Sequence, residues 1–306
     1  MKVGLVLSGG GAKGAFEAGV VKGILRKVDE FVFSYGCSTG SLISTCVASE
    51  KFDFMTRVYT RVKTGNILSC YFWKDVPILN ALPSPDLPLE VLLAIAAPLK
   101  LPALYNIEPL IELVDSNIDF TALRNAPCEV GYLTSEFDSV KSAFFKSSTA
   151  AKTLRDALFA SVSMPVFMPL VNISGKSGRY TDGGLTRHLP GKEVFQAKRY
   201  AEADAIIFVS TLPANKGSGP IDKVDEVMGI LAHTISGLSD SNDYNSLRYE
   251  IAEVGQQVIA DGKKFIVVQP DNGLPISNSL RFVPEEMKAC YDMGIQKAKA
   301  VNKLLQ

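Results

Sequence analysis

The segment from residue 3 to residue 14 reads V-G-L-V-L-S-G-G-G-A-K-G and changes character halfway through. Residues 3–7 form an apolar run of strand length, and residues 9–14 are rich in glycine, which is typical of a tight turn. Apolar side chains then recur every four positions over 15–28, the spacing of one face of a helix. The start of the chain is therefore predicted to be strand, turn and helix.

The same order repeats directly afterwards. Residues 31–35 are aromatic and β-branched, residues 36–40 read G-C-S-T-G, and residues 41–48 fit a helix. Two consecutive strand–turn–helix units place their strands parallel in one sheet. We expect an α/β fold with a doubly wound, mostly parallel central sheet and helices on both faces.

The rest of the chain continues this alternation and carries no internal repeat or long linker. We therefore predict one domain over 1–306, with its core motifs in 3–210 and a C-terminal strand and helices in 211–306. The further predicted helices are 107–114, 153–161, 285–305 and two within 220–262, and the further predicted strands are 128–134, 142–145, 206–210 and 264–269.

Composition narrows the class of protein. The 306 residues are 47% apolar and 21% charged, with 32 cationic and 32 acidic side chains, so the formal net charge is zero. These values are ordinary for a soluble globular protein and give no basis for a nucleic-acid partner. Five scattered cysteines and two histidines favour neither a disulfide framework nor a metal site. No apolar run is long enough for a signal peptide or a spanning helix, so we expect a cytoplasmic protein.

Ser38 lies between Gly36 and Gly40 where a strand is predicted to give way to a helix. A serine on such a turn stands exposed at the sheet edge, beside the N–H groups of the helix, and can act as a nucleophile if a base takes its proton. The alternative is a turn serine that caps the helix. Cys37 points away from the position that the glycines open, and Cys46 fits the core of the helix.

The glycine-rich loop has two interpretations. Gly9, Gly11 and Gly14 fit G-x-G-x-x-G, the dinucleotide-binding pattern, but the second strand lacks the acidic residue that the pattern requires. Lys13 is followed by glycine, so the phosphate-binding lysine motif also fails. Alternatively, consecutive glycines turn their N–H groups into an oxyanion hole. Both loops follow parallel strands, which brings them to the same edge of the sheet.

A base for Ser38 is also required. Asp182, which precedes Gly183 and Gly184, is the best candidate, because two glycines allow a tight loop that presents the carboxylate. A plain Asp-Gly turn is the alternative. His188 is a second candidate for the base, whereas His233 fits a structural position in a helix.

Together these motifs resemble the patatin-like phospholipase family. The similarity lies in G-G-G-A-K-G at 9–14, G-C-S-T-G at 36–40 and D-G-G at 182–184, in that order. A small-residue helix and proline-rich turn at 157–170 and a strand at 203–210 add to it. The resemblance extends over residues 3–210, and more loosely to the end of the chain.

The resemblance implies a lipid acyl hydrolase with a Ser–Asp dyad. Carried over by motif, Ser38 is the nucleophile and Asp182 is the base, and the oxyanion hole is formed by Gly9, Gly10, Gly11 and Thr39. Phospholipids or related acyl esters are the implied substrates, with transient contact to a membrane surface, no metal and no cofactor. One departure is L-T-R-H-L-P at 185–190, where the family often has asparagines. We expect His188 to be dispensable.

Two segments are candidates for contact with a bilayer. The proline-rich apolar segment over 70–105 fits either a lid or a buried insertion. Residues 176–199 hold six cations against two acids, which fits either binding of anionic headgroups or an ordinary solvated surface.

Three other functions remain open from the residues. The same acyl-Ser38 could be transferred to an alcohol or thiol, as in an acyltransferase. The loop at 9–14 could bind a nucleotide. A catalytically silent lipid-binding protein is the third, against which the intact Ser38 and Asp182 argue.

Overall fold

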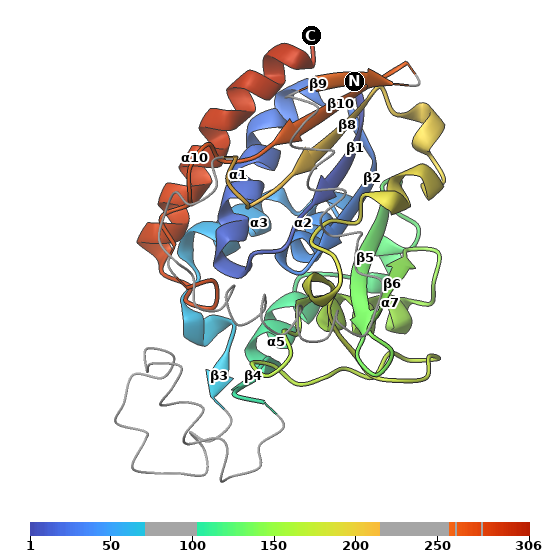
Figure 1. Ribbon diagram of the computed structural model, residues 1–306, viewed down its shortest axis with the longest axis vertical. Coiled ribbons are helices and arrows are strands. Elements are labelled where there is room, and N and C mark those ends of the chain that lie inside the picture. The colour runs from blue at the N-terminus through green and yellow to red at the C-terminus, as the bar shows by residue number, and fades with distance from the viewer. Residues whose placement is uncertain (71–102, 215–256, 261, 277) are drawn as a thin grey trace.

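A mixed sheet of eight strands forms the centre of the molecule (Figure 1). The structure is a computed structural model, and it describes residues 1–70, 103–214, 257–260, 262–276 and 278–306. The sheet consists of β1 (Lys2–Leu7), β2 (Glu30–Cys37), β5 (Glu129–Glu136), β6 (Lys141–Lys146), β7 (Tyr180–Asp182), β8 (Ala205–Val209), β9 (Gln257–Ala260) and β10 (Lys263–Val268). A separate pair is formed by β3 (Ser69–Cys70) and β4 (Tyr105–Asn106).

The strand order is β6-β5-β2-β1-β8-β10-β9, and β7 pairs with β5 as well. The five strands from β5 to β10 in this order are parallel, whereas β6, β7 and β9 run antiparallel to their neighbours. The mostly parallel α/β sheet predicted from the two strand–turn–helix units is confirmed. Figure 1 shows both chain termini at the same end of the molecule.

Alternate residues of β1 point into different cores. Leu5 and Leu7 of β1 belong to the larger cluster, which includes every described α-helix, and Val6 belongs to the smaller one. The helices are α1 (Gly14–Ile24), α2 (Thr39–Ala48), α3 (Phe52–Arg61), α5 (Glu108–Asp115), α6 (Phe120–Leu123), α7 (Ala151–Val162) and α10 (Pro284–Leu304). Over the described residues, short 3-10 helices at Lys192–Gln196 and Tyr200–Glu202 cover the second face.

The structure corrects one predicted element. The second amphipathic helix predicted within 220–262 does not extend to its expected end, because Gln257–Ala260 form β9 instead. Val258 and Ile259 are β-branched and favour a strand, and Gly262 at a φ of 70° makes the turn into β10. The rest of that prediction, His233 and most of the proline-rich segment lie outside the described residues.

Among the described residues, no helix combines the length and the apolar character needed to cross a bilayer.

Candidate active site

The two glycine loops lie side by side at the carboxyl edge of the sheet. Leu7 of β1 pairs with Gly36 of β2, so Gly9 and Ser38 each follow this pair by two residues. A Cβ atom placed on Gly9 would lie only 3.2 Å from the Cβ of Ser38. The expectation that both loops reach the same edge of the sheet is confirmed. A side chain at Gly9 would press against Ser38, which favours glycine at this position.

Ser38 has an unusual backbone. Its φ of 52° and ψ of −125° lie in a region that residues other than glycine rarely adopt. It precedes α2 directly, but its side chain makes no capping hydrogen bond. The alternative in which Ser38 is only a helix cap is therefore wrong. A serine held in a strained backbone conformation is typical of a functional site.

The flanking glycines permit this turn. A Cβ on Gly36 would lie 2.2 Å from the carbonyl carbon of Gly40, and one on Gly40 would lie 2.5 Å from the carbonyl oxygen of Ser8. Contacts this short cannot be accommodated between backbone atoms, so both positions require glycine. The turn is consequently packed directly against the end of β1.

Strand β5 brings Asp182 to this turn. Along one edge, β5 pairs first with β2 and then with β7. The pairing with β2 ends where Cys37 lies opposite Leu133. The pairing with β7 begins at the next residue of β5, where Asp182 lies opposite Thr134. The strands β2 and β7 thus lie end to end along β5. Ser38, the residue after Cys37, and Asp182 meet at the junction.

The carboxylate of Asp182 is buried, with 2% of the residue exposed. Its Oδ1 accepts a hydrogen bond of 2.7 Å from the N–H of Gly184, while Oδ2 accepts none of ordinary geometry in the described part of the chain. Burial raises the pKa of Asp182 to about 6, although the Ser38 hydroxyl and the Gly184 N–H act to lower it. A carboxylate oxygen without a well-formed hydrogen bond, such as Oδ2 of Asp182, is common in active sites that hold no ligand, because catalytic hydrogen bonds often shorten only when substrate binds.

The glycine loop presents backbone donors beside Ser38. The N–H groups of Gly9, Gly10, Gly11 and Thr39 donate to no acceptor in the described part of the chain. Gly10 and Gly11 have φ values of 150° and 53°, which an L side chain rarely adopts. The amino end of α2 adds its positive dipole at Thr39. Backbone donors of this kind can stabilise a negatively charged oxygen.

Comparison with known proteins identifies the family. The family model for patatin-like phospholipase matches residues 5–194, which is more than half of the chain and includes the glycine loop, Ser38 and Asp182. The chain belongs to the patatin-like phospholipase family.

A comparison with solved structures also found a match. The crystal structure of VipD from Legionella pneumophila matches with 14% identity and a TM-score of 0.49, over 98% of this chain and 66% of that one. The chain thus spans just under two thirds of the VipD chain. A search of curated proteins found no match.

Two serines that we did not single out from the sequence hold the site of this patatin-like protein. The Oγ of Ser161, on the last turn of α7, accepts the N–H of Ser38 at 3.0 Å and donates to the carbonyl of Leu133 at 2.6 Å. Two residues later, the carbonyl of Ser163 accepts the N–H of Asp182 at 2.8 Å. One end of α7 therefore fixes both Ser38 and Asp182. The small-residue stretch at 160–163 was the available signal.

Glu17 holds the residue that precedes the glycine loop, Ser8, by two hydrogen bonds. This carboxyl is fully buried, and its Oε1 accepts hydrogen bonds from the N–H and the hydroxyl of Ser8, at 2.7 and 2.9 Å. Burial raises the pKa of Glu17 well above its ordinary value, because burial favours the neutral acid over the carboxylate. The hydroxyl of Thr211 donates to the carbonyl of Gly9 at 2.6 Å and completes the support. The spacing pattern gave no signal for Glu17.

The structure also places two candidates that we weighed against this pair. The ring of His188 lies beside the loop, with Nδ1 at 3.7 Å from a Cβ placed on Gly9. The thiol of Cys37 is buried behind Ser38 and donates to the carbonyl of Arg187 at 3.5 Å. Burial, and then the nearby carboxylate of Asp182, raise the pKa of this thiol well above its ordinary value.

Ion pairs neutralise part of the charge of the basic segment 176–199. Three of its six cations bind acids: Arg179 pairs with Asp138, Arg187 with Glu193, and Arg199 with Glu30 and Glu202. Less charge is left for anionic headgroups than the sequence count indicated. Over the described residues, no group of three or more histidine, cysteine or acidic side chains is placed to hold a metal ion.

Proposed function

We propose that this protein is a lipid acyl hydrolase of the phospholipase A type, which cleaves fatty-acyl esters of glycerophospholipids. Ser38 is the nucleophile and Asp182 is the general base. The observation that carries the proposal is the junction on β5, where a serine in a strained backbone conformation meets a buried carboxylate. Membership of the patatin-like phospholipase family supports the substrate class.

The first half of the reaction forms an acyl-enzyme. Asp182 accepts the hydroxyl proton of Ser38, and the Ser38 oxygen attacks the ester carbonyl carbon. The negative charge that develops on the carbonyl oxygen is stabilised by the N–H groups of the 9–11 loop and Thr39. Each such donor typically lowers the barrier by about 2.7–4 kcal/mol. Collapse breaks the ester bond, and the lysophospholipid alcohol leaves with the proton from Asp182.

The second half regenerates the enzyme. Asp182 accepts a proton from water, and the resulting nucleophile attacks the acyl carbon bound to Ser38. The fatty acid then leaves, and Ser38 recovers its proton. An aspartate of ordinary pKa is a weak base for these steps, but burial raises the pKa of Asp182 to about 6 and improves the match. Asp182 is then largely ionised at pH 7–8 and still basic enough to act.

The proposal is tested by labelling with a fluorophosphonate in the presence of phosphatidylcholine vesicles, with the adduct mapped by mass spectrometry. We expect one adduct, on Ser38, and a sharp fall in labelling rate in Asp182→Asn. His188→Gln is the matched control, because it removes the other possible base from the same site. Equal losses in the two variants, or an adduct on another residue, would rule out the dyad.

Product analysis tests the type of reaction. Released fatty acid and lysophospholipid in equal amounts are expected from labelled glycerophospholipid vesicles. Acylated glycerol, formed when glycerol is added as an acceptor, would instead indicate acyl transfer from the same serine. Contact with a membrane surface follows from the proposed substrate, because phospholipids are presented in bilayers.

A further inference from the structure

The hydroxyl of Tyr59, on α3, bonds to the residue that directly follows Ser38. It lies 2.6 Å from the hydroxyl of Thr39 and donates to the carbonyl of Thr39 at 3.2 Å. A tyrosine hydroxyl carries one hydrogen, so the Thr39 hydroxyl donates in the shorter contact. Both residues are buried. Tyr59 therefore holds Thr39 at two atoms, out of contact with water.

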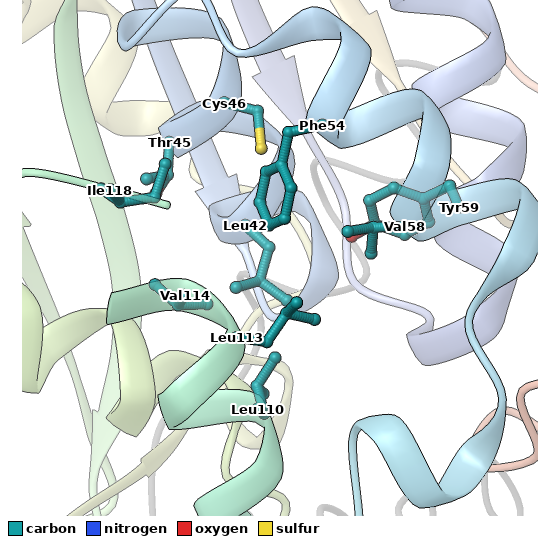
Figure 2. Close-up of a pocket in the computed structure, with 10 residues that line it drawn as sticks. All are labelled: Leu42, Thr45, Cys46, Phe54, Val58, Tyr59, Leu110, Leu113, Val114 and Ile118. Carbon is teal, nitrogen blue, oxygen red and sulfur yellow. The ribbon is translucent and has the colours of Figure 1, made fainter. Parts of the chain in front are cut away.

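The ring of Tyr59 is held by apolar packing. It lines a small apolar hollow between α2, α3 and α5, and in Figure 2 its side chain extends from α3 toward α2. No charged side chain is among the described residues that line this hollow. A buried hydroxyl without a partner is costly, so the packing of the ring and the two hydrogen bonds together fix the Tyr59 hydroxyl against Thr39.

The peptide unit between Ser38 and Thr39 is restrained from other sides as well. A Cβ atom placed on Gly14, the first residue of α1, would lie 2.4 Å from the Thr39 hydroxyl oxygen. The carbonyl of Ser38 accepts the N–H of Ser41 at 2.9 Å. This carbonyl and the N–H of Thr39 belong to one planar unit and point in opposite directions. Together with Tyr59, these contacts fix the direction of the Thr39 N–H.

We propose that Tyr59 is a positioning residue for the oxyanion hole, an inference that rests on the proposed function. Its hydroxyl holds Thr39 so that the Thr39 N–H is aimed at the oxygen that becomes negative when Ser38 attacks the ester. Such a donor stabilises the transition state only while it points at that oxygen. The end of α7, and not Tyr59, bonds to the N–H groups of Ser38 and Asp182, so the nucleophile and the base keep their places without Tyr59.

The test compares Tyr59→Phe with Tyr132→Phe on a soluble ester, p-nitrophenyl butyrate. Tyr132→Phe is the matched control, because its buried hydroxyl also contacts a threonine hydroxyl of α2, that of Thr45, at 2.7 Å. Both variants should lose comparable stability in urea denaturation. Only Tyr59→Phe should lower kcat, by about tenfold to a hundredfold and with KM unchanged. Equal losses of kcat, or a change confined to KM, would overturn the proposal.

Two further measurements separate a misdirected donor from a damaged fold. A trifluoromethyl ketone forms a hemiketal with Ser38 that carries a negative oxygen, so its Ki should rise in Tyr59→Phe by the factor by which kcat/KM falls. The pH midpoint near 6, which belongs to Asp182, should stay in place while the plateau falls. Burial raises the pKa of Tyr59 above its ordinary value, so this hydroxyl does not titrate in that range. An unchanged Ki or a shifted midpoint would overturn the proposal.

Thr39→Val is the second variant, and it tests the same contact if Tyr59→Phe fails to fold. Valine removes the hydroxyl and keeps the N–H, so kcat should fall here as well. The double variant should lose no more than Tyr59→Phe alone, because both substitutions remove one shared contact. Losses that multiply would overturn the proposal.

The order of the Thr39 N–H can be measured without any activity. In Ser38→Ala, the backbone order parameter of Thr39 from NMR relaxation should fall when Tyr59→Phe is added and stay unchanged when Tyr132→Phe is added. This result in a protein that hydrolyses no ester would keep the role of Tyr59 in holding Thr39 and reject the hydrolase. Ester hydrolysis by the wild type with an unchanged order parameter would overturn the role of Tyr59 and leave the proposed function standing.

Discussion

The backbone N–H of Ser38 donates a hydrogen bond of 3.0 Å to the hydroxyl oxygen of Ser161, a residue 123 positions away. The same hydroxyl donates to Leu133 on β5 and contacts the hydroxyl of Ser41 at 2.8 Å. A strained turn persists only when its surroundings hold it in place. Ser161 supplies that restraint, because it links the turn to both the sheet and α7.

Ser161→Ala should therefore weaken the site without removing any reacting group. We expect kcat/KM to fall by about tenfold to a hundredfold, since small displacements of reacting groups have effects of that size. The free energy of unfolding should fall by about 1–3 kcal/mol, because buried polar groups lose their partner. Ester hydrolysis and urea denaturation measure the two effects.

Ser163→Ala is the matched control for this variant. Its hydroxyl donates only to the carbonyl of Phe159, within α7, while the carbonyl that holds Asp182 is kept. Activity close to that of the wild type is expected. Equal losses in the two variants would show that Ser161 acts only through the stability of α7.

Activity should depend on the ionisation of Asp182. Burial raises the pKa of this group to about 6, and only the carboxylate form can accept the Ser38 proton. The rate of fluorophosphonate labelling should therefore rise with pH through a midpoint near 6 and level off above about 7. A profile that is flat between pH 5 and 8 would contradict the assignment of Asp182 as the base.

Asp182→Asn should make the fold more stable while it removes activity. The folded pKa of about 6 lies above the ordinary 3.8, so the folded state binds a proton that the unfolded chain has released. Wild-type stability therefore declines as pH rises from about 4 to 6, by about 3 kcal/mol in total. The Asp182→Asn variant should not show this decline in stability, because asparagine does not titrate. Urea denaturation should show little difference at pH 4 and the full gain at pH 8; an equal difference at both would refute the linkage.

Glu17 should tolerate glutamine but not alanine. Burial favours the neutral form of this carboxyl, and Glu17→Gln keeps both a neutral side chain and an oxygen that accepts from Ser8. Glu17→Ala removes that acceptor next to the glycine loop. We expect near-normal kcat for Gln and a marked loss for Ala. Above pH 4.5 wild-type stability falls as pH rises, because the unfolded chain ionises Glu17 first, and Gln should remove that fall. Equal damage by both substitutions would show that the charged form is needed.

Gly11→Ala should damage both the fold and the site. The new Cβ would lie 2.2 Å from the carbonyl oxygen of Ser279, at a φ of 53°. Gly175→Ala is the control, because its φ of 77° imposes similar strain but nothing lies within 4 Å. The control should lower the free energy of unfolding by about 1–2 kcal/mol and keep activity. Gly11→Ala should lose more stability and most labelling at Ser38.

The sequence predicted most of the sheet, because strand length, glycine turns and helical periodicity are local properties. The strands at 3–7, 31–35 and 206–210 correspond to β1, β2 and β8. Strand β7 was not predicted, since three buried residues carry no period of their own. The helix expected toward residue 262 failed at β9, where pairing with β10 decided the structure.

The sequence by itself determined the two glycine loops and the position of Ser38, because glycine spacing after an apolar strand constrains the backbone locally. Only the tertiary structure decided what surrounds Ser38. The register of β5 places Asp182 at the end of β2, and the end of α7 holds both residues. Burial, which changes the pKa of Asp182 and Glu17, depends on contacts between distant segments. Those contacts have no local pattern, because the same residue types form them at any separation along the chain.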